Sequence, residues 1–267
     1  MESTTVAYGP HPDQVADVHL PDVGPEAGPV PLVLLLHGGF WREQYDRAHV
    51  DPVARALAGR GWCTANVEYR RVGGDGGWPT TFVDVARAVD TLPALVEQVS
   101  DGRVDAGRAL LAGHSAGGHL ALWAGLRHRL PAGAPGRTAE VPRLLGVVAL
   151  APAADLRWAH ELGSGQGAVA DFLGGPEQFP DRFAAADPAA LGKADIATVV
   201  VHGDQDERLP VEMARRYAEI AGARLIVPEG CGHSDLIDPR SGAWPLITAA
   251  MDGLLAARPA SPDAVRV

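Results

Sequence analysis

The segment 113–117 reads G-H-S-A-G, the spacing of a serine nucleophile between two glycines. It follows a short apolar run at 108–113 and precedes a helical pattern over 116–129. A sharp turn between a strand and a helix would hold Ser115 in a strained conformation, with its hydroxyl exposed above the sheet edge. The free N–H groups and the dipole at the start of the helix would favour a developing negative charge there. Ser115 is therefore the candidate nucleophile.

A second glycine-containing segment, 37–41 (H-G-G-F-W), follows an earlier apolar run. In such a loop successive backbone N–H groups can point to one location, and glycine lets the backbone come close to a ligand. An ordinary strand-to-helix loop is the alternative, but the position upstream of the serine favours an oxyanion hole. We expect the N–H groups of Gly39, Phe40 and Ala116 to hold the oxygen of a tetrahedral intermediate. His37 is expected to brace the loop rather than to transfer protons.

A serine nucleophile needs a base, and the base needs a carboxylate to orient it. Where the serine lies on a strand-to-helix turn of this kind, the order along the chain is Ser, then Asp or Glu, then His. Of the ten histidines, only His202 and His233 follow the long irregular segment 152–194. His202 ends a predicted strand, whereas His233 lies in the loop G-C-G-H-S. His233 is the predicted base.

Two aspartates compete for the role of the orienting acid. Asp204 and Asp206 both follow the predicted strand 196–202, so both should lie at the carboxyl edge of the sheet. The register H-G-x-x-D-x-x-x-P favours Asp206 and leaves Asp204 as a turn-forming residue. Asp235 and Asp238 are interpreted as local turn and cap residues.

Short apolar runs alternate with longer segments of helical period, which predicts an α/β fold with a mostly parallel central sheet and helices on both faces. The predicted strands span 15–20, 31–37, 63–69, 108–113, 145–151, 196–202 and 223–228. The predicted helices span 51–58, 81–99, 116–129, 211–221 and 242–257. Pro93 should kink or split the second of these helices.

The chain of 267 residues fits a single domain spanning 1–267. The segment 152–194 is too long for an ordinary connection, and we interpret it as a cap or lid over the carboxyl edge of the sheet. Its residues Trp158 and Phe172, together with Trp41, are candidate substrate contacts, although each is also compatible with ordinary packing.

Charge and composition exclude several classes of function. The 23 basic and 33 acidic residues give a formal charge of −10, which opposes binding to nucleic acid or anionic lipid. The longest apolar run is far shorter than the roughly 20 residues of a membrane span. No signal peptide is visible, so we expect a cytoplasmic protein. We also expect the two cysteines to be free, buried thiols, and residues 258–267 to form a frayed tail. Nothing in the sequence indicates an oligomeric state.

The segments HGGFW, GHSAGG, HGDQDERLP and GCGHSDLIDP, in this order, resemble the α/β-hydrolase fold over residues 15–257. Within that fold the chain is similar to the esterase/arylformamidase branch, close to the hormone-sensitive-lipase-like carboxylesterases. That branch commonly has H-G-G-G, and Phe40 takes the place of the third glycine here. The form H-G-G-x-W is similar to the loop of animal and yeast kynurenine formamidases, which hydrolyse N-formylkynurenine. The segment 68–70 (E-Y-R) resembles both groups.

The resemblance implies a cofactor-free serine hydrolase that uses Ser115, Asp206 and His233 to cleave a small-acyl ester or an aryl formamide through an acyl-enzyme. No H-E-x-x-H or paired-cysteine motif predicts a metal site. A general short-chain carboxylesterase is one alternative, and acyl transfer to an acceptor other than water is another. A non-catalytic ligand-binding member of the fold is the alternative from a different class, although the intact set of motifs opposes it.

Overall fold

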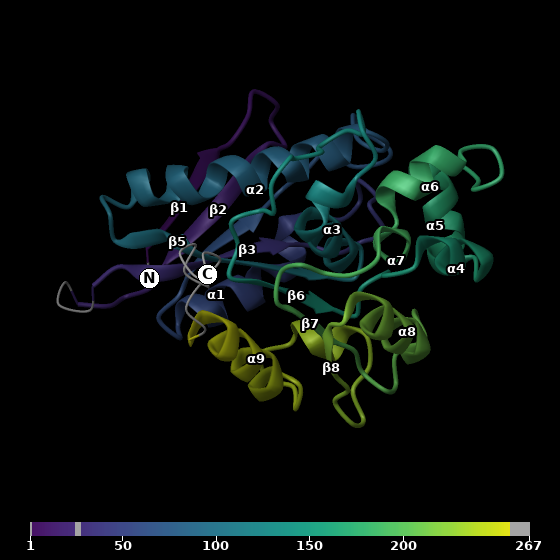
Figure 1. The fold of residues 1–267 in the computed structure, drawn as a ribbon. Coiled ribbons are helices and arrows are strands. Elements are labelled where there is room, and N and C mark those ends of the chain that lie inside the picture. Colours follow the sequence, from purple (N-terminus) through teal and green to yellow (C-terminus); the bar gives the residue numbers. More distant parts are fainter. Residues whose placement is uncertain (1, 25–27, 257–267) are drawn as a thin grey trace, which may run out of the picture.

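The computed structural model describes residues 2–24 and 28–256, and its centre is a mixed sheet of eight strands (Figure 1). The order across the sheet is β1-β2-β4-β3-β5-β6-β7-β8. The strands are β1 (Glu2–Ala7), β2 (Val15–Leu20), β3 (Val30–Leu36), β4 (Cys63–Val67), β5 (Val104–His114), β6 (Gly146–Leu150), β7 (Thr198–Val201) and β8 (Arg224–Ile226). Strands β1 and β2 are antiparallel to their neighbours, and β4, β3, β5, β6, β7 and β8 are mutually parallel. The predicted mostly parallel sheet is confirmed.

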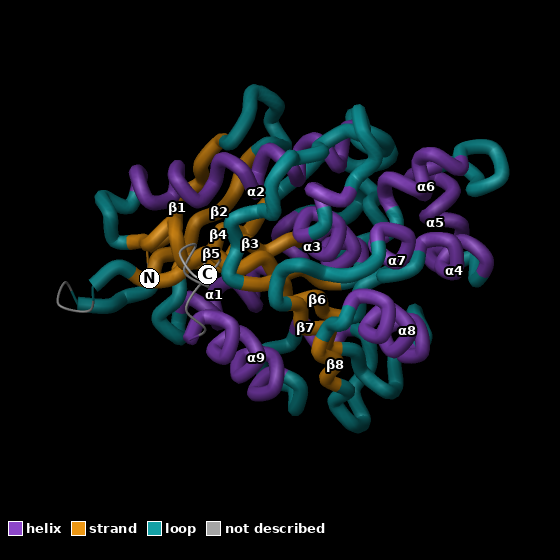
Figure 2. The backbone as a smooth tube through the Cα atoms, viewed as in Figure 1, coloured by secondary structure: helices purple, strands orange, loops and turns teal. Residues whose placement is uncertain are grey.

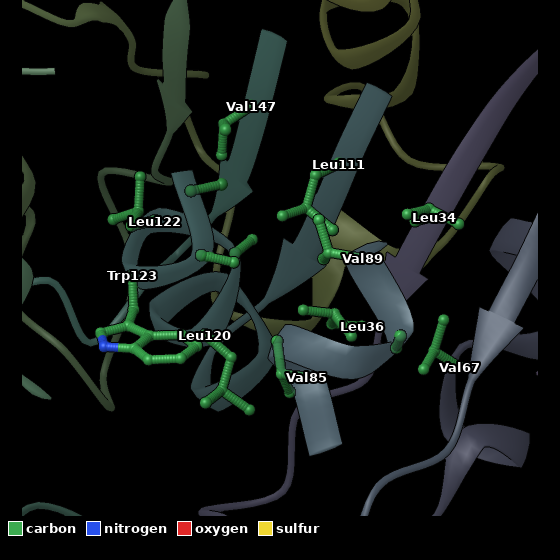
Figure 3. Close-up of a cluster of buried hydrophobic side chains, with 14 of the residues drawn as sticks. Leu34, Leu36, Val67, Val85, Val89, Leu111, Leu120, Leu122, Trp123 and Val147 are labelled. Carbon is green, nitrogen blue, oxygen red and sulfur yellow. The ribbon is translucent and has the colours of Figure 1, made fainter. Parts of the chain in front are cut away.

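Helices cover both faces of this sheet, as Figure 2 shows. One face is covered by α2 (Thr80–Val99), α3 (Ala116–Gly125) and α8 (Val211–Ala221), and the other by α1 (Asp51–Ala58) and α9 (Trp244–Ala256). Strand β3 is buried along its whole length because its alternate side chains enter different cores. Leu34 packs toward α2 and α3 (Figure 3), while Leu35 packs toward α1 and α9.

Helix α2 runs through Pro93 as one element, so the predicted split at this proline is wrong. Proline removes one backbone hydrogen bond and crowds the preceding turn. Val85, Val89, Leu92 and Val96 form one buried apolar stripe on both sides of Pro93. Packing of this stripe against the sheet holds the two halves in one helix.

Other predicted boundaries shift by a few residues. The helix predicted over 116–129 ends as α3 at Gly125 and is followed by the 3-10 turn η3 (Arg127–Arg129). Two further 3-10 turns are η2 (Arg47–Val50) and η4 (Ser234–Ile237). The predicted tail at 258–267 lies outside the described residues.

The segment 152–194, here called the cap segment, follows β6 at the carboxyl edge of the sheet. It contains α4 (Leu156–Glu161), α5 (Ser164–Leu173), α6 (Pro180–Ala186) and α7 (Pro188–Leu191). In Figure 1, α4, α5 and α6 lie together at the end of the molecule away from β1 and β2. In the described ranges no helix is long and apolar enough to cross a bilayer.

Candidate active site

Four loops meet at one edge of the sheet because β3, β5, β7 and β8 are parallel and each ends there. The segment 37–41 follows β3, and Ser115 follows β5. The loops 202–210 and 227–233 follow β7 and β8. The fold thus brings together the four motifs that lie up to 200 residues apart in the chain.

Ser115 occupies a strained turn between β5 and α3, with φ 55° and ψ −117°. Its N–H donates to the carbonyl of Leu150 over 2.8 Å, which ties the turn to β6. A side chain at Gly113 would collide with the backbone of Gly117, and one at Gly117 would collide with the carbonyls of Leu36 and His37 at the end of β3. The glycine spacing is therefore a steric requirement of this turn, as the sequence predicts.

The oxyanion loop candidate has an unusual backbone. Gly39, Phe40 and Trp41 all have positive φ, at 108°, 57° and 58°. A side chain on Gly39 would collide with the ring of Tyr45, so glycine is required there. No carbonyl of the described residues accepts the N–H of Gly39 or Phe40, and the N–H of Ala116 is at the first position of α3. Three donors are therefore available beside Ser115.

A buried ionic network supports this loop from behind. His37 Nε2 donates to Glu68 Oε1 over 2.9 Å, and Arg71 Nη1 lies 2.8 Å from the same oxygen. The Tyr69 hydroxyl donates to the carbonyl of His37 over 2.7 Å, and the two rings stack. Burial raises the pKa of Glu68, but the hydrogen bond and charge of His37 and the charge of Arg71 outweigh it and hold the pKa below its usual value. His37 thus lies where a bracing residue is expected.

His233 and Asp206 are directly paired. His233 Nδ1 donates to Asp206 Oδ2 over 2.7 Å, which leaves Nε2 as the unprotonated nitrogen of the neutral ring. Asp206 Oδ1 accepts the backbone N–H groups of Arg208 and Leu209 at 2.8 and 3.0 Å. Asp204, the competing candidate, is exposed. The structure therefore places Asp206, and not Asp204, at the histidine.

His202 lies on the same carboxylate, although the sequence offers it only as a rival base. Its Nε2 is 3.2 Å from Asp206 Oδ2 and also donates to the carbonyl of Leu209 over 2.9 Å. Burial raises the pKa of Asp206, but the hydrogen bonds from His202 and His233 lower it by more. The pKa of Asp206 therefore lies far below its usual range. Asp206 is consequently ionised at any physiological pH. This pairing of His202 is a feature that sequence reasoning missed.

The ring of His114 lies directly against His233, with 4.7 Å between the ring centres. His114 Nε2 donates to the backbone carbonyl of His233 over 3.0 Å, which fixes the position of that loop. Burial, together with the charge of nearby His233, holds the pKa of His114 well below its usual value. His114 is thus a neutral positioning residue beneath the candidate base.

Two small cavities meet at Ser115 and Phe40. The first, here called the apolar cavity, has a free volume of about 10 Å³ and is lined by Phe40, Trp41, Ser115, Ala116, Ala153, Ala159, Ser164, Val169 and Leu209. The second, here called the polar cavity, has about 60 Å³ and is lined by Gly39, Phe40, Tyr45, His49, His114, Ser115, Arg208, His233 and Ser234. Ser115 and His233 thus face a common space.

Only one of the three predicted substrate contacts lines these cavities. Trp41 lines the apolar cavity and donates from its indole to His119 Nδ1 over 3.2 Å. Phe172 is a core residue that stacks behind Trp41, with 4.7 Å between the ring centres, and Trp158 is half-buried elsewhere in the cap segment. In the part of the chain that the structure describes, no group of three or more His, Cys, Asp or Glu side chains could hold a metal ion.

Solved structures with the same architecture support the predicted α/β-hydrolase fold. A truncated carbohydrate esterase from gut microbiota matches with a TM-score of 0.75 and 20% identity, over 95% of each chain. A thermophilic esterase from Thermogutta terrifontis matches with a TM-score of 0.69 and 22% identity, over 95% of this chain and 91% of that one. The chain has the α/β-hydrolase fold.

Sequence relatives and a family model extend this likeness. Esterase LipC of Mycobacterium tuberculosis is 30% identical over an alignment of 253 positions, which covers 87% of this chain and 60% of LipC. Esterase LipQ of the same organism is 25% identical over 81% of this chain and 52% of LipQ. The chain thus spans between half and two thirds of the length of these relatives. The BD-FAE family model matches residues 16–220, so this chain belongs to the BD-FAE family.

Proposed function

We propose that the chain is a serine carboxylesterase in which Ser115 is the nucleophile, His233 the general base and Asp206 the orienting acid. The observation that carries the proposal is the 2.7 Å hydrogen bond between His233 and Asp206, beside a strained serine that shares a cavity with the histidine. The names of LipC and LipQ as esterases support the same class of reaction.

The reaction follows from the positions of these groups. His233 Nε2 takes the proton of Ser115 as its oxygen attacks the ester carbonyl carbon, and Asp206 stabilises the resulting imidazolium. The N–H groups of Gly39, Phe40 and Ala116 hold the oxyanion. The carbon–oxygen bond to the alcohol then breaks, and His233 gives its proton to the leaving oxygen. Water repeats the sequence and releases the acid.

We assign the leaving group of the ester to the polar cavity and its acyl group to the apolar cavity. The leaving oxygen must lie within reach of His233, which lines only the polar cavity. The acyl chain is then left with the apolar cavity, whose free volume is that of about one water molecule. The size of this space favours a short acyl group such as acetyl. A formyl group also fits, so an aryl formamide such as N-formylkynurenine is the second candidate substrate.

The test is the specificity constant kcat/KM for p-nitrophenyl acetate, butyrate and octanoate beside N-formylkynurenine. We expect turnover of the esters to fall steeply with chain length, and Ser115→Ala to abolish it without changing the fold. Ser3→Ala, which removes an exposed hydroxyl on β1, is the control and should match the wild type. Wild-type turnover by Ser115→Ala would refute the assignment, and turnover of the formamide alone would replace the esterase with a formamidase.

A further inference from the structure

The polar cavity has a charge of its own, opposite in sign to that of the chain. The chain carries ten more acidic than basic side chains. No Asp or Glu is among the residues that line this cavity, and Arg208 is the lining residue with a permanent charge. Tyr45 and Ser234 line the same cavity. The Asp206 carboxylate is buried behind His233, so a substrate that enters this cavity meets the Arg208 guanidinium and not the carboxylate.

Arg208 is free to use that charge on a ligand. It is exposed, and it forms no ion pair with any acidic residue that the structure describes, whereas Arg216 and Arg240 pair with Asp155 and Asp238. Its guanidinium carbon lies 5.8 Å from the centre of the Phe40 ring. The side chain thus lies over the oxyanion loop, at the side of the cavity that His233 also lines.

The direction of the reaction determines which part of the substrate meets Arg208. His233 must protonate the leaving oxygen, so the alcohol portion of the ester occupies the polar cavity. An arginine fork offers two parallel N–H donors that match the two oxygens of a carboxylate. A negative group on the alcohol portion would find this partner there, against the overall field of the chain.

We propose that Arg208 is a specificity residue that selects esters whose alcohol portion carries a carboxylate. The proposal deepens the esterase function proposed above and rests on it. It assigns Arg208 to ground-state and transition-state binding of the leaving group, and not to the proton transfers, which belong to His233.

The experiment compares two acetate esters of equal size, 4-acetoxybenzoate and 4-acetoxybenzamide, which differ in one negative charge. The kcat/KM ratio of the anionic to the neutral ester is measured for the wild type, Arg208→Gln and Arg208→Lys. Comparing this ratio between enzymes cancels the intrinsic reactivity of the two esters. Arg143→Gln is the matched control, because Arg143 is exposed and lies three residues before β6, at the opposite edge of the sheet.

We expect Arg208→Gln to lower the ratio roughly fivefold, the scale of one exposed charge pair, with a smaller loss in Arg208→Lys and none in Arg143→Gln. The wild-type preference should also shrink in 0.5 M NaCl, since salt screens exposed charges. An unchanged ratio in Arg208→Gln would overturn the proposal, and this includes an equal fall in kcat/KM for the two esters. If the wild type hydrolyses neither ester, the esterase function itself fails, and the proposal fails with it.

Discussion

The buried residues beneath Ser115 and the cap segment above it are held by different kinds of interaction. Beneath the serine, the Asp206 carboxylate receives contacts from two histidine side chains and two backbone N–H groups. The Glu68 carboxylate beneath the oxyanion loop is equally buried and pairs with His37 and Arg71. We call these two networks the frame. Each is cut off from water, so losing one partner would leave a buried charge unpaired.

The cap segment contacts the same loop through weaker interactions. The Arg42–Asp171 pair is short, at 2.7 Å, but its side chains are 23% and 50% exposed. The first turn of α5 has positive φ at Gly165, Gln166 and Gly167, and a side chain at Gly165 would collide with the Phe40 ring. Under the proposed function, the frame would hold the residues that carry out the reaction, whereas the cap segment would set which acyl group fits.

The largest effect is expected at the acid. Asp206→Asn removes the charge that stabilises the protonated His233, and we expect kcat for every ester to fall by about 10⁴. Asp204→Asn is the matched control, two residues away and exposed, and should change kcat less than twofold. Steady-state rates on p-nitrophenyl acetate measure kcat for both variants. Equal losses in the two variants would show that the frame does not depend on Asp206.

A second prediction concerns the stability of the frame. Glu68→Gln removes the buried counter-ion of Arg71, which keeps the half-buried Asp13 carboxylate at 3.2 Å, and it places an amide group against donors. We therefore expect a loss of about 3–5 kcal/mol in the free energy of unfolding. Urea denaturation measures it, with the exposed Glu219→Gln on α8 as the control. A loss below 1 kcal/mol would mean that the network contributes little to the stability of the loop.

A third prediction concerns the pH dependence of stability that arises from Asp187 in the cap segment. Burial raises the pKa of Asp187, the N-cap residue of α7, to about 6. Because this folded-state pKa lies above that of an unfolded aspartate, ionisation favours unfolding. The contribution of this group to stability is complete below about pH 4 and is lost as the pH rises through about 6.

Asp187→Asn should remove this dependence, because the amide cannot ionise and its oxygen can still accept the N–H of Ala189. We expect the variant to gain about 2 kcal/mol over the wild type between pH 4 and pH 7.5. Denaturation at the two pH values measures the gain, and Asp22→Asn, at an exposed position outside the cap segment, should show none. A gain of the same size in Asp22→Asn would assign the pH dependence to overall charge.

The smallest expected effect is on acyl preference. Val169 in α5 is buried and lines the apolar cavity, so Val169→Ala should widen it by two methyl groups. We expect the kcat/KM ratio of butyrate to acetate to rise roughly tenfold, the scale of one or two methylene groups in an apolar pocket. Val83→Ala, on the exposed face of α2, is the control. An unchanged ratio would place the acyl group outside this cavity.

Features that depend on local residues are predicted from the sequence better than those that depend on distant contacts. Helices α1 and α8 match their predicted bounds, and the turn around Ser115 follows from glycine spacing, because these features depend on local residues. Strand β1 was not predicted, since this edge strand is mostly exposed and lacks an apolar pattern. The short helices of the cap segment have too few turns for a periodic signal.

Long-range pairing explains the functional residues that were missed. Glu68 follows β4 and contacts His37, which follows β3 and lies 31 residues earlier in the chain. No local pattern in the sequence indicates that contact. His202 is visible in the sequence as a residue at the end of a strand, but its position against Asp206 depends on how the following loop folds back. The placement of Phe172 behind Trp41, outside the cavity, depends in the same way on the packing of α5.

The most direct test of the central claim is labelling by an organophosphate such as paraoxon, followed by mass spectrometry of the intact chain and its peptides. We predict one diethylphosphoryl group per chain, attached to Ser115, with labelling absent in Ser115→Ala and strongly slowed in Asp206→Asn. An unlabelled wild-type chain, a label on another residue, or equally fast labelling of Asp206→Asn would contradict the account of Ser115 as a nucleophile activated by His233 and Asp206.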